Sequence, residues 1–139
     1  MKRHVALLAL IAALSGAAAA QPRQSLREAR AQDAAEQLLA SQVAYTNSVC
    51  GLTMTSGIDW ATVGDWPDAA LVDACDRALG AVELACRAGS RKSQIASLSR
   101  VVCAGDGSGP SLQARVFRYG AAVGVDAFEQ TRAMLDALR

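Results

Sequence analysis

The fold of this chain is decided by residues 67–89, PDAALVDACDRALGAVELACRAG. Proline suits the first turn of a helix and glycine suits its end, so we predict one helix that begins at Pro67 and stops at Gly89. We expect Glu83 and Arg87, four residues apart, on its solvent-facing side. The apolar positions recur at helical spacing and predict the buried side: Cys75, Leu79, Val82 and Cys86.

The segments on either side of this helix alternate apolar and polar residues, which is typical of strands. We predict a first strand over residues 50–60, with Cys50 at its start, and a second over residues 98–104, with Cys103 near its end. A strand, a helix and a strand in this order form a β-α-β unit. The two strands are therefore expected to run parallel, with the helix antiparallel across them.

This topology indicates how the four cysteines pair. Cys75 and Cys86 lie roughly 16 Å apart along a continuous helix, whereas a disulfide requires α-carbons within about 7 Å. They cannot bond to each other while the helix is unbroken. The end of the helix returns to the start of the first strand, which favours Cys50–Cys86 and Cys75–Cys103 and leaves the other two pairings open. Each bridge is expected to add about 3–4 kcal/mol to the unfolding free energy.

Three further elements complete the predicted order. Ser25 and Glu28 have the spacing of a capping box, so a helix is expected to begin there. A third strand is predicted over residues 112–119, and Asp126 is expected to cap a final helix. The first helix has a stripe at spacings of three and four, which Leu39 and Val43 widen: Ala31, Ala35, Leu38, Gln42, Tyr45 and Val49. The prediction is a small single α+β domain, in the order α-β-α-β-β-α, with a three-stranded mixed sheet packed with helices and two disulfides.

The N-terminal segment has the three parts of a secretory signal peptide. A cationic start at Lys2 and Arg3 precedes an apolar run over residues 5–14 and small residues over 15–20. We expect residues 1–20 to be cleaved and residues 21–139 to form the domain, exported to the periplasm or secreted. An apolar run of about ten residues is shorter than the roughly 20 that a bilayer span needs, so no stable membrane insertion is expected after cleavage.

Composition weighs against several classes of function. Cleavage removes Lys2 and Arg3 from the 14 basic residues and none of the 13 acidic residues, which leaves a net charge of about −1. Without a clustered cationic surface, no nucleic-acid partner is expected. The one histidine, His4, lies in the signal segment, and the cysteines show no Cys-x-x-Cys spacing. We therefore expect no metal site, no cofactor and no catalytic residue.

The candidate ligand-binding residues are Asp59, Asp106 and Trp66. Asp59 lies near the end of the first predicted strand and Asp106 follows the second, and the two strand ends are expected on the same side of the sheet. Trp60 is expected in the core, whereas Trp66, beside Pro67, is the better candidate for an exposed contact. The leading hypothesis is an exported, non-catalytic module that binds a protein or cell-wall component, as an inhibitor or accessory factor. The alternative is a small glycan hydrolase that uses Asp59 and Asp106 as acid and base.

Overall fold

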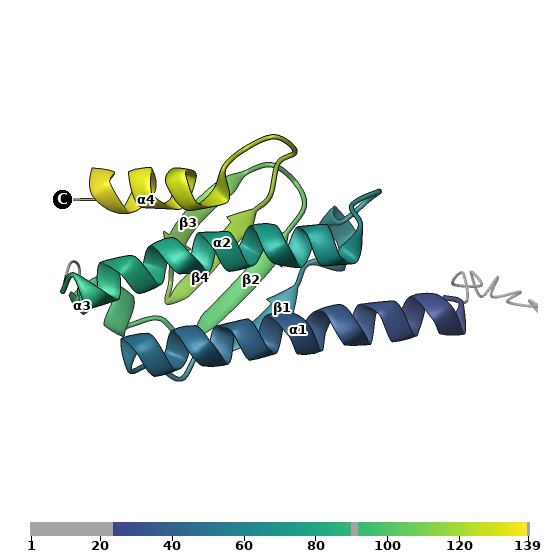
Figure 1. The fold of residues 1–139 in the computed structure, drawn as a ribbon, viewed down its shortest axis with the longest axis horizontal. Coiled ribbons are helices and arrows are strands. Elements are labelled where there is room, and N and C mark those ends of the chain that lie inside the picture. The colour runs from purple at the N-terminus through teal and green to yellow at the C-terminus, as the bar shows by residue number, and fades with distance from the viewer. Residues whose placement is uncertain (1–23, 90–91, 139) are drawn as a thin grey trace, which may run out of the picture.

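The computed structural model describes residues 24–89 and 92–138. The expected signal peptide, residues 1–20, lies outside these ranges. Three long helices lie side by side on one face of a sheet (Figure 1). They are α1 (Leu26–Cys50), α2 (Asp68–Arg87) and α4 (Ala127–Ala137), with α2 in the middle. Among the described residues, none of the helices has the length and apolar character to cross a membrane.

The sheet contains four strands in the order β1-β2-β4-β3. β1 (Thr55–Ile58), β2 (Arg100–Ala104) and β4 (Val116–Gly120) run parallel, and β3 (Gly109–Gln113) pairs antiparallel with β4. The helix α2 therefore connects two neighbouring parallel strands, as a β-α-β unit requires. Two short helices, η1 (Trp60–Thr62) and α3 (Lys92–Ala96), lie in the connections. The predicted α+β class is confirmed.

The prediction of three strands is wrong, because residues 112–119 are not one strand but span a hairpin turn between β3 and β4. Ala114 and Arg115 form the turn, with φ angles of 46° and 69°. Two-residue hairpin turns with positive φ favour Asn and Gly, so these two residues give no turn signal. Tertiary contacts hold the turn: the Arg115 carbonyl accepts from Ser99 N at 2.8 Å, and Arg115 Nε donates to the Ser97 carbonyl at 2.9 Å.

The first strand is also shorter than the predicted 50–60. Cys50 is the last residue of α1, and Gly51 follows with a φ of 68°, the left-handed conformation that commonly ends a helix. The side chain of Asn47 then accepts from Met54 N at 2.9 Å and donates to the Met54 carbonyl at 3.0 Å. The alternation of apolar residues before Thr55 thus belongs to a connection that packs on the core, not to a paired strand.

The predicted extent of the central helix is confirmed, since α2 begins after an N-cap at Pro67. Three members of its predicted stripe, Cys75, Leu79 and Val82, are buried. Glu83, however, is buried against α1, where its Oε1 accepts from Thr46 Oγ1 at 2.7 Å. The prediction of a solvent-facing Glu83 is wrong because α1 packs along that side of α2.

The start of α1 is confirmed, and its buried face lies along the side of the predicted stripe that Leu39 and Val43 widen. Ser25 caps the helix as expected: its Oγ accepts from Glu28 N at 3.2 Å, and its own N–H donates to Glu28 Oε2 at 2.8 Å. Leu38 is 43% exposed and Tyr45 is 56% exposed. The residues that pack inward are Ala35, Leu39, Val43 and Thr46. Ala35, Leu39 and Val43 belong to the predicted apolar side, so the sequence pattern located this face in part and missed Thr46.

The structure contains two disulfides, Cys50–Cys86 and Cys75–Cys103, with Cα–Cα distances of 5.4 and 6.0 Å. This is the pairing that the β-α-β topology favours. Cys50–Cys86 joins the C-terminal ends of α1 and α2, and Cys75–Cys103 joins α2 to β2. The middle helix is therefore cross-linked both to a neighbouring helix and to the sheet.

Candidate functional site

Asp59 and Asp106 lie at the same edge of the sheet, where the parallel strands end. Asp59 directly follows β1, and Asp106 lies in the loop that follows β2. Asp59 N donates to the carbonyl of Cys103 at 2.8 Å, which holds the two strand ends together. In open sheets with parallel strands, ligands commonly bind outside these carboxyl ends. The structure thus brings the two candidate carboxylates into one site.

A residue that the sequence analysis missed, Arg118, lies between them. Arg118 Nη2 is 3.6 Å from Asp59 Oδ2 and forms an ion pair with Asp106 Oδ2. Arg118 Nη1 lies 3.3 Å from Asp106 Oδ1 and donates to Ser108 Oγ at 2.6 Å. Arg118 alternates with the buried Phe117 and Tyr119 on β4, so it points to the face without helices. That alternation was the one sequence signal that could have identified it.

The loop after β2 is folded onto this cluster by Asp106 itself. Asp106 Oδ1 accepts from Ser108 N at 3.1 Å and from Ser108 Oγ at 2.7 Å, which is an Asx-type turn. Gly120, at the end of β4, leaves the space that the loop occupies. A Cβ at this position would collide with both Asp106 Oδ1 and Ser108 Oγ. Glycine at 120 is therefore required for the loop to reach Arg118.

Ion pairing fixes the charge state of the cluster. The hydrogen bonds from Arg118, and then those from Ser108, hold the pKa of Asp106 far below its ordinary value of 3.8. The same hydrogen bond to Asp106 raises the pKa of Arg118. A glycosidase needs a carboxyl group whose pKa is raised, so that it can donate a proton to the leaving group. Asp106 is shifted in the opposite direction, so it lacks this property of a general acid.

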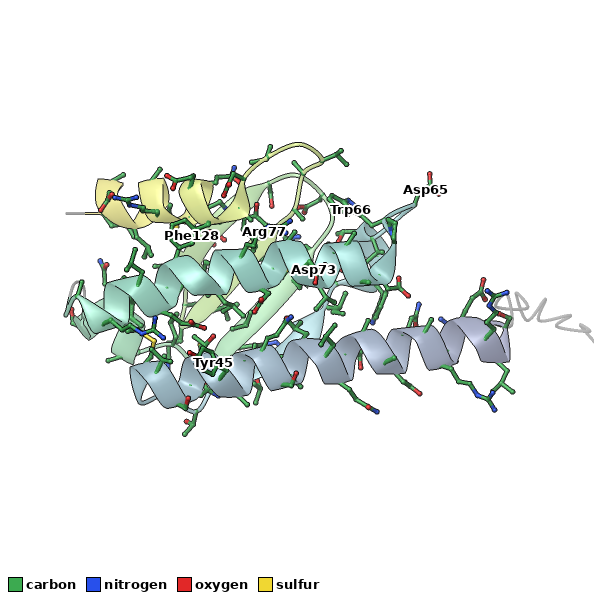
Figure 2. All side chains as sticks on the ribbon, in the orientation of Figure 1. Tyr45, Asp65, Trp66, Asp73, Arg77 and Phe128 are labelled. Atoms are coloured by element: carbon green, nitrogen blue, oxygen red, sulfur yellow. A yellow bond between two sulfur atoms is a disulfide. The ribbon has the colours of Figure 1, made fainter. Side chains whose placement is uncertain are left out.

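Trp66 lies in the loop that follows β1, next to Asp65 (Figure 2). Its indole packs so closely on Gly105 that a Cβ there would come 2.9 Å from Trp66 Cδ1. It is half-buried, and so is Trp60, whose Nε1 donates to Glu36 Oε1 at 2.7 Å. The two indoles therefore do not divide into one core and one exposed residue. Trp66 packs on Gly105, the residue before Asp106, while Trp60 is hydrogen-bonded to α1 through Glu36.

A second feature, which the sequence analysis did not identify, is a groove at the open edge of β1. It has a volume of about 520 Å³, within the range of small-ligand sites. Its walls come from α1 on one side and from β1 and β2 on the other. The lining residues are Asp33, Glu36, Gln37, Ala40, Ser56, Gly57, Ile58 and Arg100. No local pattern indicates this groove, because it exists only where the first half of α1 passes β1.

The described residues give no sign of a metal centre. Within 24–89 and 92–138, no three His, Cys, Asp or Glu side chains are grouped so that they could hold an ion. The four cysteines are bonded in pairs, so none offers a thiolate ligand.

No protein-family model matches the chain, and no curated protein or solved structure matches it either.

Proposed function

We propose that this chain is an exported, non-catalytic module that binds a protein or a cell-envelope component, as an inhibitor or an accessory factor. The two disulfides are compatible with an exported location, because such bonds persist in oxidising compartments. The observation that carries the proposal is the contrast between two regions. The carboxylates at the strand ends are bound by Arg118, whereas the groove beside β1 is open.

The charge state of the strand-end cluster supports binding rather than hydrolysis. Arg118 lowers the pKa of Asp106, which is the opposite of the shift that a general acid requires. In the alternative, a glycan hydrolase with Asp59 and Asp106 as acid and base, Asp106 could act as the acid only after a ligand displaced Arg118. A binding module requires no such rearrangement.

The test compares envelope association with cell-wall turnover. Labelled, disulfide-bonded protein without residues 1–20 is sedimented with isolated cell envelopes, and the same preparation is incubated with purified cell-wall glycan. We expect saturable association that excess unlabelled protein displaces, with no release of soluble sugars. The reduced and alkylated chain is the control for non-specific adsorption. Sugar release that Asp106→Asn abolishes would establish the hydrolase instead.

A further inference from the structure

The strand β1 forms one edge of the sheet, and half of its backbone groups point away from β2. The amides of Thr55 and Asp59 donate to carbonyls on the β2 side at 3.0 and 2.8 Å. In a parallel ladder alternate residues bond to the neighbouring strand, so Ser56 and Ile58 direct their N–H and C=O groups to the opposite side. No strand of residues 24–89 or 92–138 lies there. These groups form a template for one more strand.

The opposite edge of the sheet, β3, is blocked in two ways. Gln113 pairs with Val116 across a two-residue turn, so its backbone N–H and C=O groups face β4. Backbone groups of successive residues alternate between the two sides of a strand. Pro110, three residues before Gln113, therefore lies where an N–H would face the open side. Proline has no N–H, so it cannot donate to an added strand. In addition, α4 packs beside β3, and a Cβ on Gly109 would come 2.7 Å from Gln130 Nε2. β1 contains no proline, and α1 lines the space beside it rather than filling it.

The groove beside β1 has the charge to receive a basic side chain. Asp33 forms no ion pair within the part of the chain that the structure describes. Glu36 accepts the neutral indole N–H of Trp60, so its charge is also uncompensated. Side chains of a strand alternate between its two faces, so every second side chain of an added strand would point toward these carboxylates on α1. Arg100 is the one basic residue among those that line the groove, and its guanidinium lies against Gly57, on the face of the sheet opposite α1.

We propose that β1 binds an extended segment of a partner protein as an additional strand, with a Lys or Arg side chain of that segment held by Asp33 and Glu36. This inference rests on the proposed binding function and names its site and the chemistry of its partner. Main-chain hydrogen bonds to Ser56 and Ile58 supply affinity, and the two carboxylates select the basic residue. A second copy of this chain fits less well, because β1 itself, with the sequence TSGI, would offer no basic side chain to these carboxylates.

The first arm of the test selects binders from displayed random peptides of about ten residues, which is long enough to form a strand. The target is the disulfide-bonded protein. We expect the selected peptides to carry Lys or Arg among β-forming residues and to protect the amides of Ser56 and Ile58 from hydrogen exchange. Ser56→Pro removes an outward N–H and should weaken their binding at least tenfold. No enrichment, or peptides that protect other amides, would overturn the inference.

The second arm keeps the backbone intact and changes only charge, so it remains decisive if Ser56→Pro fails to fold. Asp33→Asn combined with Glu36→Gln should weaken the selected peptides about fivefold at low salt and less at high salt. The matched control is Asp65→Asn, on the tip of the loop that follows β1 (Figure 2) and not among the residues that line the groove. An equal loss in the control would show a general charge effect and contradict the site.

The envelope assay separates the two proposals. If the native protein associates with envelopes and Ser56→Pro and the charge variant associate equally well, the β1 site is wrong but the binding function stands. If the native protein shows no saturable association, the binding function itself fails. Self-association that Ser56→Pro abolishes, measured by sedimentation equilibrium, would assign the edge to a second copy and overturn the partner proposal.

Discussion

The two disulfides close loops of similar length but lie in very different surroundings. Cys75–Cys103 lies in the core, where its residues are 1% and 0% exposed. Cys50–Cys86 is half-buried and borders a surface cavity of about 370 Å³. With sequence separations of 28 and 36, the chain-entropy model assigns them about 3.6 and about 3.8 kcal/mol. Loop length therefore does not distinguish the two bonds, and any difference between them must come from burial.

Burial affects the two bonds in different ways. A reductant reaches Cys50–Cys86 from solvent, whereas it reaches Cys75–Cys103 only after α2 separates from β2. Removal of the buried sulfur atoms also leaves unfilled space between α2 and the sheet, and packing around such a space is costly. The outer bond should therefore open first, and loss of the inner bond should cost more stability.

Complete reduction should have the largest effect. Loss of both constraints removes about 7 kcal/mol in the chain-entropy model, which is a large part of the 5–15 kcal/mol by which domains are typically stable. We expect the near-ultraviolet circular dichroism of the native state to disappear under strong reductant. Limited reduction followed by alkylation and peptide mapping should label Cys50 and Cys86 before Cys75 and Cys103. Native dichroism that survives full reduction would contradict the stabilising role of the bonds.

Removal of one bond at a time should separate burial from loop length. We expect Cys75→Ala with Cys103→Ala to lower the unfolding free energy by about 4–5 kcal/mol, because it adds a cavity to the lost constraint. Cys50→Ala with Cys86→Ala should cost about 3.8 kcal/mol, the chain-entropy value alone. Urea unfolding at neutral pH measures both values. Equal losses would mean that the chain-entropy term alone sets the contribution of each bond.

The parts of the fold that the sequence predicted correctly depend on local chemistry. Pro67 before α2, the Ser25–Glu28 capping box and the Asp126 N-cap of α4, whose side chain accepts from Glu129 N at 3.0 Å, all act within one helical turn. Once the central helix was placed between two strands, the β-α-β unit could be predicted, because a strand, a helix and a strand in sequence pack together in few ways.

The parts that the sequence did not predict depend on contacts between distant residues. The hairpin turn at Ala114 and Arg115 is held by Ser97 and Ser99, not by a preference of its own residues. In the candidate site, strand order brought Asp59 and Asp106 together as expected. Their bond to Arg118 could not be predicted, because the strand that carries Arg118 was not recognised as separate from β3.

A smaller effect is expected from the polar contact that joins the same two helices as the outer disulfide. Thr46 lies about one turn before Cys50, and its hydroxyl donates to buried Glu83 at 2.7 Å. Thr46→Val leaves that carboxylate without its donor and should cost about 1–2 kcal/mol of unfolding free energy. The same change in a chain that also carries Cys50→Ala and Cys86→Ala should cost a different amount, because both links hold α1 against α2.

The control for this cycle is Ser41→Ala, since Ser41 lies exposed on α1 and its hydroxyl donates to the Leu38 carbonyl of its own helix. Its cost should stay within about 0.5 kcal/mol in either background. If the costs of Thr46→Val and of the double cysteine change simply add, the polar contact and the outer disulfide act independently.

The smallest effect should come from the ion pair at the strand ends, which links β2 and β4 without a covalent bond. The folded-state pKa of Asp106 lies below its ordinary value of 3.8, so its stabilising contribution is fully present above about pH 4. That contribution is lost as the pH falls toward the folded-state value. Because the Asp106 side chain is 34% exposed, solvent screens the pair, and Asp106→Asn should cost less than about 1 kcal/mol at pH 7.

The pH dependence of the unfolding free energy tests whether the charge of Asp106 is stabilising. Native protein and Asp106→Asn should differ most in unfolding free energy near neutral pH and converge as acid protonates Asp106, while Ser41→Ala, which removes no titratable group, should run parallel to the native curve. Urea unfolding between pH 7 and pH 3 provides the comparison. A difference that stays constant across this range would show that Asp106 acts through its hydrogen bonds alone. In that case the charge of Asp106 would add nothing to the stability of the sheet. Asp106 would then stabilise the strand ends only through its hydrogen bonds to Ser108 and Arg118, whereas the two disulfides act as covalent links.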